Sequence, residues 1–330
     1  MKPRPPRAGQ AGFTLVELMI SLVLFSFAIA GVLAVAVSMA QGLREQRAAV
    51  GAETSARVPI DFIGDAIRQA SPAVPNGTIW DAATCTSTAI TVTDNQSGAT
   101  DPTLTGWDKL DIIFASGGVV VSSESTYNGA TTTLTLTDTS QLAIGDSIVA
   151  TDTNTGTLLK ITGISGTTVN VAPPSAICSG SIPSYSPPFL VIRAQHATFT
   201  LDTVDGQPTL LMDPDATGPA APQPLAEGIE DMQVAQGYDA GAGVVENAIV
   251  NGDQWWCNVI GESSASGKPA GTPRALRVSL TARTTSGLVG NLNPYNRPAV
   301  ENHAAATTFD QFRRRVLITT VEIRNLSGSP

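Results

Sequence analysis

The pattern of hydrophobic and polar positions divides the chain into three unlike stretches. The first is an apolar run over residues 13–40, FTLVELMISLVLFSFAIAGVLAVAVSMA, in which Glu17 is the one charged residue. At 1.5 Å per residue a helix of this length extends about 42 Å, enough to cross a hydrocarbon core of about 30 Å. Three basic residues and no acid precede it in residues 1–12, so the positive-inside rule predicts one membrane-spanning helix with a cytoplasmic N-terminus.

The second stretch, residues 41–71, keeps a helical pattern but becomes amphipathic. Its apolar positions recur at helical spacing and predict a stripe that packs on a sheet: Val58, Phe62, Ile63, Ala66, Ile67 and Ala70. The polar positions of the opposite face are Asp61, Asp65, Arg68 and Gln69. Pro59 is expected to kink this helix or to begin a second one, and Ser71-Pro72 to end it.

The third stretch, residues 72–330, is expected to form a β-rich head. Between residues 76 and 200 the chain is rich in Thr, Ser, Gly and Val, and polar and apolar residues alternate over 89–93, 109–114 and 133–137. Such alternation predicts strands with one solvated face. Short strands separated by turns over 143–171 indicate a small barrel or meander, and a possible small β subdomain covers 118–175.

The last third returns to a helix–sheet pattern. Residues 274–283 alternate cleanly and predict a core strand, and residues 312–325 predict a final strand. The fold class expected from all three stretches is α+β. A long N-terminal helix, half membrane-spanning and half amphipathic, would pack on an antiparallel β-sheet head with an additional Thr-rich β subdomain.

Composition and charge narrow the function. Only 14% of residues are charged, 19 basic and 28 acidic, and the pI of about 4.7 excludes a nucleic-acid binder, which needs a basic surface. The charge is unevenly spread: residues 71–192 hold two lysines and nine acids, whereas residues 274–330 hold eight arginines and three acids. These regions could steer neighbouring subunits together, or the arginines could neutralise the acidic region within one subunit.

Three cysteines exclude a dense disulfide scaffold. Cys85 and Cys178 flank the Thr-rich region, so we expect them to pair in an oxidising compartment and leave Cys257 as a buried thiol. Bridges from Cys257 to either of the other two remain open alternatives.

No catalytic motif stands out, and neither an enzyme activity nor a cofactor or metal is expected. A nucleophile elbow, a phosphate-binding loop and an H-E-x-x-H motif are missing from the sequence, and His196 and His303 have no evident partner near them in sequence. Asp213 and Asp215 begin like a calcium loop, but Pro224 stands where the bidentate glutamate belongs, which favours a turn. The pair Trp255-Trp256 could form a carbohydrate platform, although buried aromatic residues are commoner.

The start of the apolar run resembles the type IV prepilin signature. A basic leader ends at Gly12 and is followed by Phe13, Thr14, two apolar residues and Glu17, then by the apolar helix; Gln10-Ala11 replaces the more usual charged residue before the glycine. The resemblance implies that a prepilin peptidase cuts after Gly12, that Phe13 is methylated, and that the Glu17 carboxylate pairs with the N-terminal amine of a neighbouring subunit. Loss of residues 1–12, with their three basic residues, would change the net charge from −9 to −12.

Three further segments resemble PilW-type minor pilins, namely residues 61–70, 229–234 with 274–280, and 312–325. This resemblance implies a non-catalytic minor pilin that acts in initiation or tip-complex assembly of a type IV pilus. Its expected partners are other pilins, the prepilin peptidase, the inner-membrane assembly machinery and membrane lipid. The protein would span the inner membrane once with a periplasmic head and later join the pilus. The alternatives are a pseudopilin of type II secretion and a pilus-associated adhesin that uses the Thr-rich region.

Overall fold

The computed structural model describes residues 14–101, 104–178, 182–216, 220–238, 254–257, 259–260, 262, 269, 273–285, 287 and 294–326. The chain divides into two compact units, Met1–Ala48 and Ala49–Pro330, which we describe separately. All of the strands among the described residues lie in the second unit.

One helix, α1 (Leu15–Arg68), occupies the N-terminal part of the chain. It continues without interruption through Pro59, so the expectation that Pro59 begins a second helix is wrong. A proline inside a helix costs about 3 kcal/mol because it removes a backbone hydrogen bond. Burial of Ile60 and Ile63, which follow the proline, offsets that cost, since each fully buried aliphatic side chain contributes about 1.5–3 kcal/mol.

The buried face of α1 differs in part from the predicted stripe. Ile63, Ala66 and Ile67 are buried as expected, but Val58 is 71% exposed and Phe62 is 38% exposed. Small residues one or two turns earlier take their place, and the buried helical positions are Ala49, Ala52, Ala56, Pro59, Ile60, Ile63, Gly64, Ala66 and Ile67. The predicted stripe left out Ala49, Ala52 and Ala56, which are buried because alanines allow the closest approach of a helix to a sheet.

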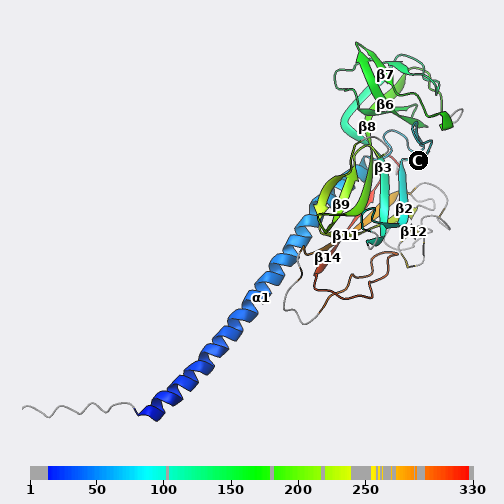
Figure 1. Cartoon of the computed structure of the whole chain (residues 1–330). Coiled ribbons are helices and arrows are strands. Elements are labelled where there is room, and N and C mark those ends of the chain that lie inside the picture. The colour runs from blue at the N-terminus through cyan, green and yellow to red at the C-terminus, as the bar shows by residue number, and fades with distance from the viewer. Residues whose placement is uncertain are drawn as a thin grey trace, which may run out of the picture. The chain divides into compact units, whose positions relative to one another are not determined.

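Two sheets form the rest of the second unit (Figure 1). The first ten strands are β1 (Ile79–Asp81), β2 (Ile90–Ser97), β3 (Thr105–Ser123), β4 (Thr133–Thr135), β5 (Ser147–Thr151), β6 (Gly156–Ser165), β7 (Thr168–Val171), β8 (Phe189–Val204), β9 (Gln207–Asp213) and β10 (Gln223–Glu227). They form one sheet with the order β10-β9-β8-β5-β6-β7-β4, in which β3 also pairs with β8 and with β2, and β1 pairs in parallel with β6. A short 3-10 helix, Ala176–Cys178, precedes β8.

The second sheet is antiparallel, with the order β12-β11-β13-β14. Its strands are β11 (Ile229–Tyr238), β12 (Gln254–Trp256), β13 (Ala275–Arg283) and β14 (Arg314–Glu322). The core strand and the final strand expected from alternation are thus confirmed as β13 and β14. The helix expected in the last third is not present among the described residues of that region, where strands and connecting segments occupy the chain.

The main core lies between α1 and both sheets. Ile63 and Ile67 of the helix share one buried cluster with three residues of β13 in the second sheet, Leu276, Val278 and Leu280. The same cluster includes Phe199 of β8, whose ring meets Phe62 edge-on at a centroid distance of 6.1 Å. The helix residues 49–68 therefore join the two sheets through one apolar interior.

The Thr-rich region has a core of its own. β5, β6 and β7 are consecutive antiparallel neighbours, so the expected meander over 143–171 is confirmed. In the buried cluster of this region Tyr127 and Tyr185 stack with ring centroids 5.8 Å apart, and Phe189 packs against Tyr185. Figure 1 shows β6 and β7 at the far end of the second unit from β11 and β14. The α+β fold class, a long helix on antiparallel sheets, is confirmed.

Candidate functional site: an apolar helix and a charged network

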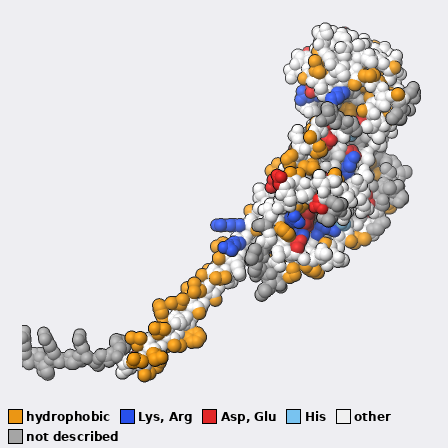
Figure 2. Space-filling view, viewed as in Figure 1, with side chains coloured by type: hydrophobic (Ala, Val, Ile, Leu, Met, Phe, Trp, Pro, Cys, Tyr) orange, Lys and Arg blue, Asp and Glu red, His pale blue; other side chains and the backbone are white. Residues whose placement is uncertain are grey.

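The first feature with functional content is the exposed apolar surface of residues 15–39. Figure 2 shows orange side chains gathered along this part of α1, and large apolar residues from Leu15 to Met39 are 44–77% exposed. In the described part of the chain α1 is the one helix long and apolar enough to cross a membrane, with a mean hydropathy of 2.7 over its most apolar window and none of that window buried. Such a surface requires lipid or other apolar helices around it.

Glu17 lies in the first turn of α1. The hydroxyl of Thr14 accepts a hydrogen bond from the Glu17 backbone N–H at 3.3 Å, so Thr14 caps the helix. A carboxylate in the first turn also complements the helix dipole, which gives Glu17 a structural role in addition to the expected pairing. Gly12 and Phe13, where processing is expected, lie outside the described residues.

The polar side chains deeper in the apolar segment satisfy themselves locally. Ser21 donates to the carbonyl of Leu18 at 3.0 Å, and Ser26 donates to the carbonyl of Leu22 at 2.8 Å. Each hydroxyl is therefore satisfied within its own helix and imposes no need for a partner. The Glu17 side chain differs from these serines because it carries a charge on the same exposed apolar surface.

Cys85 and Cys178 form a disulfide, with their Cα atoms 5.2 Å apart. The bond joins the segment after β1 to the 3-10 helix before β8, across 93 residues. Cys257 is buried directly after β12 and does not take part in this bond.

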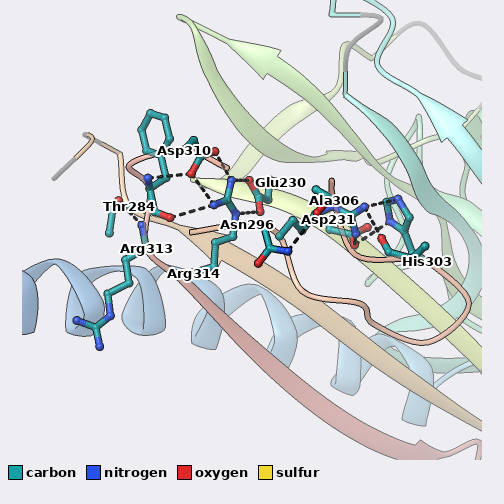
Figure 3. A network of polar contacts seen from close by, with 12 residues as sticks. Glu230, Asp231, Thr284, Asn296, His303, Ala306, Asp310, Arg313 and Arg314 are labelled. Carbon is teal, nitrogen blue, oxygen red and sulfur yellow. Dashed lines mark hydrogen bonds and ion pairs between the residues drawn. The ribbon is translucent and has the colours of Figure 1, made fainter. Parts of the chain in front are cut away.

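The second feature is a charged network on the second sheet (Figure 3). Arg314 at the start of β14 forms two hydrogen bonds with Glu230 of β11 and two with Asp310, the latter at 2.7 and 2.6 Å. Arg314 and Glu230 are each 8% exposed. Burial by itself lowers the pKa of Arg314, but the hydrogen bonds to Asp310 and Glu230 outweigh burial and raise it, so the guanidinium stays charged.

A neighbouring part of the network centres on Asp231. Its carboxylate accepts from Arg297 at 3.0 Å and contacts His303 Nδ1 at 2.9 Å, and it is 1% exposed. Gln233, two residues along β11, donates to Asp231 at 2.8 Å and to the carbonyl of Gly106 in β3 at 2.8 Å. The side chains of β11 thus attach both β3 and the 294–313 segment to the second sheet.

The 294–313 segment is fixed mainly by polar contacts. Glu301 accepts from the two ends of the Arg277 guanidinium at 2.8 and 2.6 Å and from Ser279 at 3.1 Å, and both these partners lie on β13. Three arginines of the basic C-terminal region, Arg277, Arg297 and Arg314, therefore pair with acids at positions 230–310. The acidic residues of 71–192, which we considered as partners within the subunit, do not form these ion pairs.

Most of this network has no signal in the sequence. The ring of His303 contacts Asp231, 72 residues earlier in the chain, and lies 2.7 Å from a nitrogen of Arg297. His196 likewise contacts Asp81 at 3.4 Å, beside a cavity of about 230 Å³. Trp255 is 4% exposed and stacks under Arg277, which excludes it as a carbohydrate platform.

The carboxyl groups of Asp94 and Asp108 are neighbours close to this network. Asp108 of β3 is fully buried and accepts from the backbone N–H of Val234 at 2.8 Å. Burial and the neighbouring Asp94 raise the pKa of Asp108 well above its usual range.

No three or more His, Cys, Asp or Glu side chains are grouped to hold a metal ion in the residues that the structure describes. The Asp213–Asp215 region forms a turn in which Asp213 accepts from the Asp215 backbone at 3.2 Å.

Comparison with known proteins links these features to a class. Residues 7–33 match the prokaryotic N-terminal methylation motif, and residues 198–325 match the family described as type IV pilus-assembly protein W. A solved structure, a type IV-like pilin from Thermus thermophilus, is 14% identical to this chain, with a match that covers 56% of this chain and 87% of that one at a TM-score of 0.24. A likeness at this TM-score supports no further statement. No curated protein matches the chain.

An exposed apolar N-terminal helix that carries a methylation motif, followed by a β-rich unit, defines a type IV pilin-like protein. The match over residues 198–325, which contains β11, β13, β14 and most of the charged network, is a similarity of this part of the chain to the PilW family.

Proposed function

We propose that the protein is a minor pilin that acts in initiation or tip-complex assembly of a type IV pilus, through subunit packing and without catalysis. The observation that carries the proposal is the exposed apolar surface of residues 15–39, within and directly after a methylation motif. Such a helix suits two environments in turn, the bilayer before assembly and the helices of other pilins after it.

Processing and pairing follow from the same segment. A prepilin peptidase would cut between Gly12 and Phe13, and the new N-terminus at Phe13 would be methylated. A carboxylate costs about 2.5–3.5 kcal/mol at the centre of a bilayer. Pairing of Glu17 with the amine of a neighbouring subunit would offset that cost, and a low dielectric strengthens the attraction.

The expected topology places the N-terminus in the cytoplasm and the second unit in the periplasm. The disulfide between Cys85 and Cys178 supports this placement, because such bonds persist in oxidising compartments. In the assembled state the protein would lie in the pilus, at its tip.

The experiment replaces Glu17 with alanine in cells that assemble the pilus. We expect Glu17→Ala to leave cleavage after Gly12 intact, since the cleavage point precedes it, and to reduce piliation strongly. Ser21→Ala is the matched control, because Ser21 lies one turn further along the same exposed surface and bonds only to its own helix. Normal piliation in the Glu17→Ala strain would contradict the assembly role.

A pseudopilin of type II secretion is the second candidate, because its N-terminal helix would need the same properties. Deletion of the gene separates the two functions. Loss of pili with normal protein secretion supports the pilus role, and loss of secretion with normal pili supports the alternative.

A further inference from the structure

A cavity of about 440 Å³ lies where the second sheet meets the connections of the first. Its walls come from the connection between β2 and β3, the turn between β8 and β9, the strands β11, β13 and β14, and the 294–313 segment. Arg283, the last residue of β13, lines this cavity. A cavity of this volume is within the range of small-molecule sites.

Arg283 differs from the arginines of the charged network in its lack of a paired acid. Arg277, Arg297 and Arg314 each form an ion pair with an acid. Among the residues that the structure describes, none accepts a hydrogen bond from the Arg283 side chain, and its Nε is buried without a partner. Because a guanidinium carries five N–H donors and no acceptor, the missing partner of Arg283 is an acceptor group.

The position of Arg283 is fixed and unfavourable for its charge. Its Cζ lies over the ring of Phe312, 4.4 Å from the ring centroid. Arg314 lies directly opposite Arg283 on the neighbouring strand, and like charges in opposite positions of a sheet are destabilising. Burial lowers the pKa of Arg283, and the charge of Arg314 acts in the same direction, yet an arginine in a protein stays protonated. Charges held at such a cost are found more often at binding sites than elsewhere.

Other residues of the cavity supply further donors and an apolar wall. The hydroxyls of Thr307 and Thr308 form no hydrogen bond with any residue of the described ranges, so they are available to a ligand. Leu104 and Pro208 line the same cavity and provide apolar surface. A cation, hydroxyl donors and an apolar wall together suit an anionic group that is carried on a short carbon chain.

We propose that this cavity binds an organic carboxylate on the guanidinium of Arg283. The planar fork of an arginine matches the two oxygens of a carboxylate. Three acids, Glu230, Asp310 and Asp101, lie within electrostatic range of Arg283 and oppose a second negative charge in the cavity. A carboxylate with one charge therefore fits this cavity better than a phosphate monoester, which carries about 1.5 to 2 charges at pH 7.

Two sources supply this chemistry: a free organic acid, and a glutamate or aspartate side chain of a neighbouring subunit. The contacts made by the cavity are the same in both cases. Binding of a free carboxylate by the isolated protein does not depend on a pilus. The inference therefore goes beyond the proposed function, and its failure would leave that function untouched.

The test uses the full-length protein in detergent and sodium propionate, which has the carbon chain and the carboxylate of a glutamate side chain. Relative to sodium chloride at equal ionic strength, we expect propionate at about ten times its Kd to raise the Tm by about 2–4 °C. Arg283→Gln should abolish this rise. Arg315→Gln is the matched control, since it removes the same charge from an exposed position outside the cavity and should keep the rise.

Two further variants keep the test informative if Arg283→Gln does not fold. Arg283→Lys retains the charge but loses the fork, and Thr308→Val removes one hydroxyl donor at an exposed position, so each should weaken propionate binding severalfold. A wild-type Tm that responds to propionate no more than to chloride would overturn the proposal. An equal response in the wild type and in Arg283→Gln or Arg283→Lys would overturn it as well, because propionate would then bind elsewhere.

A second arm identifies the source of the carboxylate. A photo-crosslinking amino acid is placed at Thr307 in piliated cells, with and without Arg283→Gln. With propionate binding established, a crosslink to an acidic segment of another subunit that is lost in Arg283→Gln supports a side chain as the natural ligand. Propionate binding without any such crosslink supports a free organic acid.

Discussion

Removal of the Cys85–Cys178 disulfide should produce a large loss of stability whose size follows from the length of the loop. The bond closes a loop with a sequence separation of 93 residues. In the chain-entropy account, a cross-link over this distance destabilises the unfolded state by about 4.6 kcal/mol at 25 °C. Natural domains have a total stability of about 5–15 kcal/mol, so the loss would be a large part of the whole.

The assay is denaturant unfolding of the full-length protein in detergent, comparing the wild type with the Cys85→Ser, Cys178→Ser double variant. We expect the free energy of unfolding to fall by roughly 3–5 kcal/mol. Cys178 is buried with its sulfur 3.3 Å from the carbonyl of Ala82, a contact that a serine hydroxyl can replace, so little of the loss should come from packing. The wild type treated with reductant is the control and should resemble the double variant. A loss below about 1 kcal/mol would refute the reasoning, and a non-reducing peptide map with Cys257 in the bond would refute the pairing itself.

Three further changes test the packing and the charges. Arg314→Met should lower the free energy of unfolding by about 3–5 kcal/mol, because it leaves Glu230 buried without its partner. Adding Glu230→Gln should recover part of this loss, measured by denaturant unfolding. No recovery in the double variant would contradict the pairing of Arg314 with Glu230. Burial alone would raise the pKa of Asp202, but the hydrogen bonds donated to its carboxylate outweigh burial and lower the pKa. The ionised carboxylate therefore stabilises the folded state above the unfolded pKa of about 3.9. This stabilisation is lost as the pH falls through the lower pKa of the folded state. Asp202→Asn should therefore reduce the change of Tm with pH between about pH 2 and 5. The same dependence of Tm on pH in the variant and in the wild type would contradict this role of Asp202. Ile63→Ala should cost about 2–5 kcal/mol, whereas Val58→Ala, at an exposed position on the same helix, should stay within about 0.5 kcal/mol; equal costs would mean that the helix packs on a different face.

Local patterns predicted those elements whose physical cause is local. The apolar run of residues 13–40 predicted the start of α1, and clean alternation over 274–283 predicted β13, whose apolar residues Leu276, Val278 and Leu280 belong to the main core. The meander over 143–171 was predictable for a similar reason, since its turns are marked by glycine and asparagine. In each case neighbours in sequence determine the conformation.

Features that depend on distant residues were not predictable. The burial of Ile60 and Ile63 keeps Pro59 within a continuous helix, and that burial comes in part from β8 and β13, far along the chain. The 294–313 segment brings the ring of His303 to Asp231, which lies 72 residues earlier in the chain. A contact of this kind depends on how a segment without regular secondary structure crosses a sheet, which composition and periodicity do not encode.

The charged network also limits what the basic C-terminal region can bind. Arg277, Arg297 and Arg314 each direct their charge into a buried acid of the same unit, so these three side chains are not available to an external anion. Their role in the folded state is to hold the 294–313 segment against β11 and β13. The subunit packing that we propose therefore rests on the apolar helix and not on these arginines.

The central claim is that the chain is processed as a prepilin before it assembles. Intact mass and N-terminal sequencing of the protein purified from piliated cells test it most directly. The account predicts a chain that begins at a methylated Phe13 and lacks residues 1–12. A chain that still begins at Met1 would contradict it.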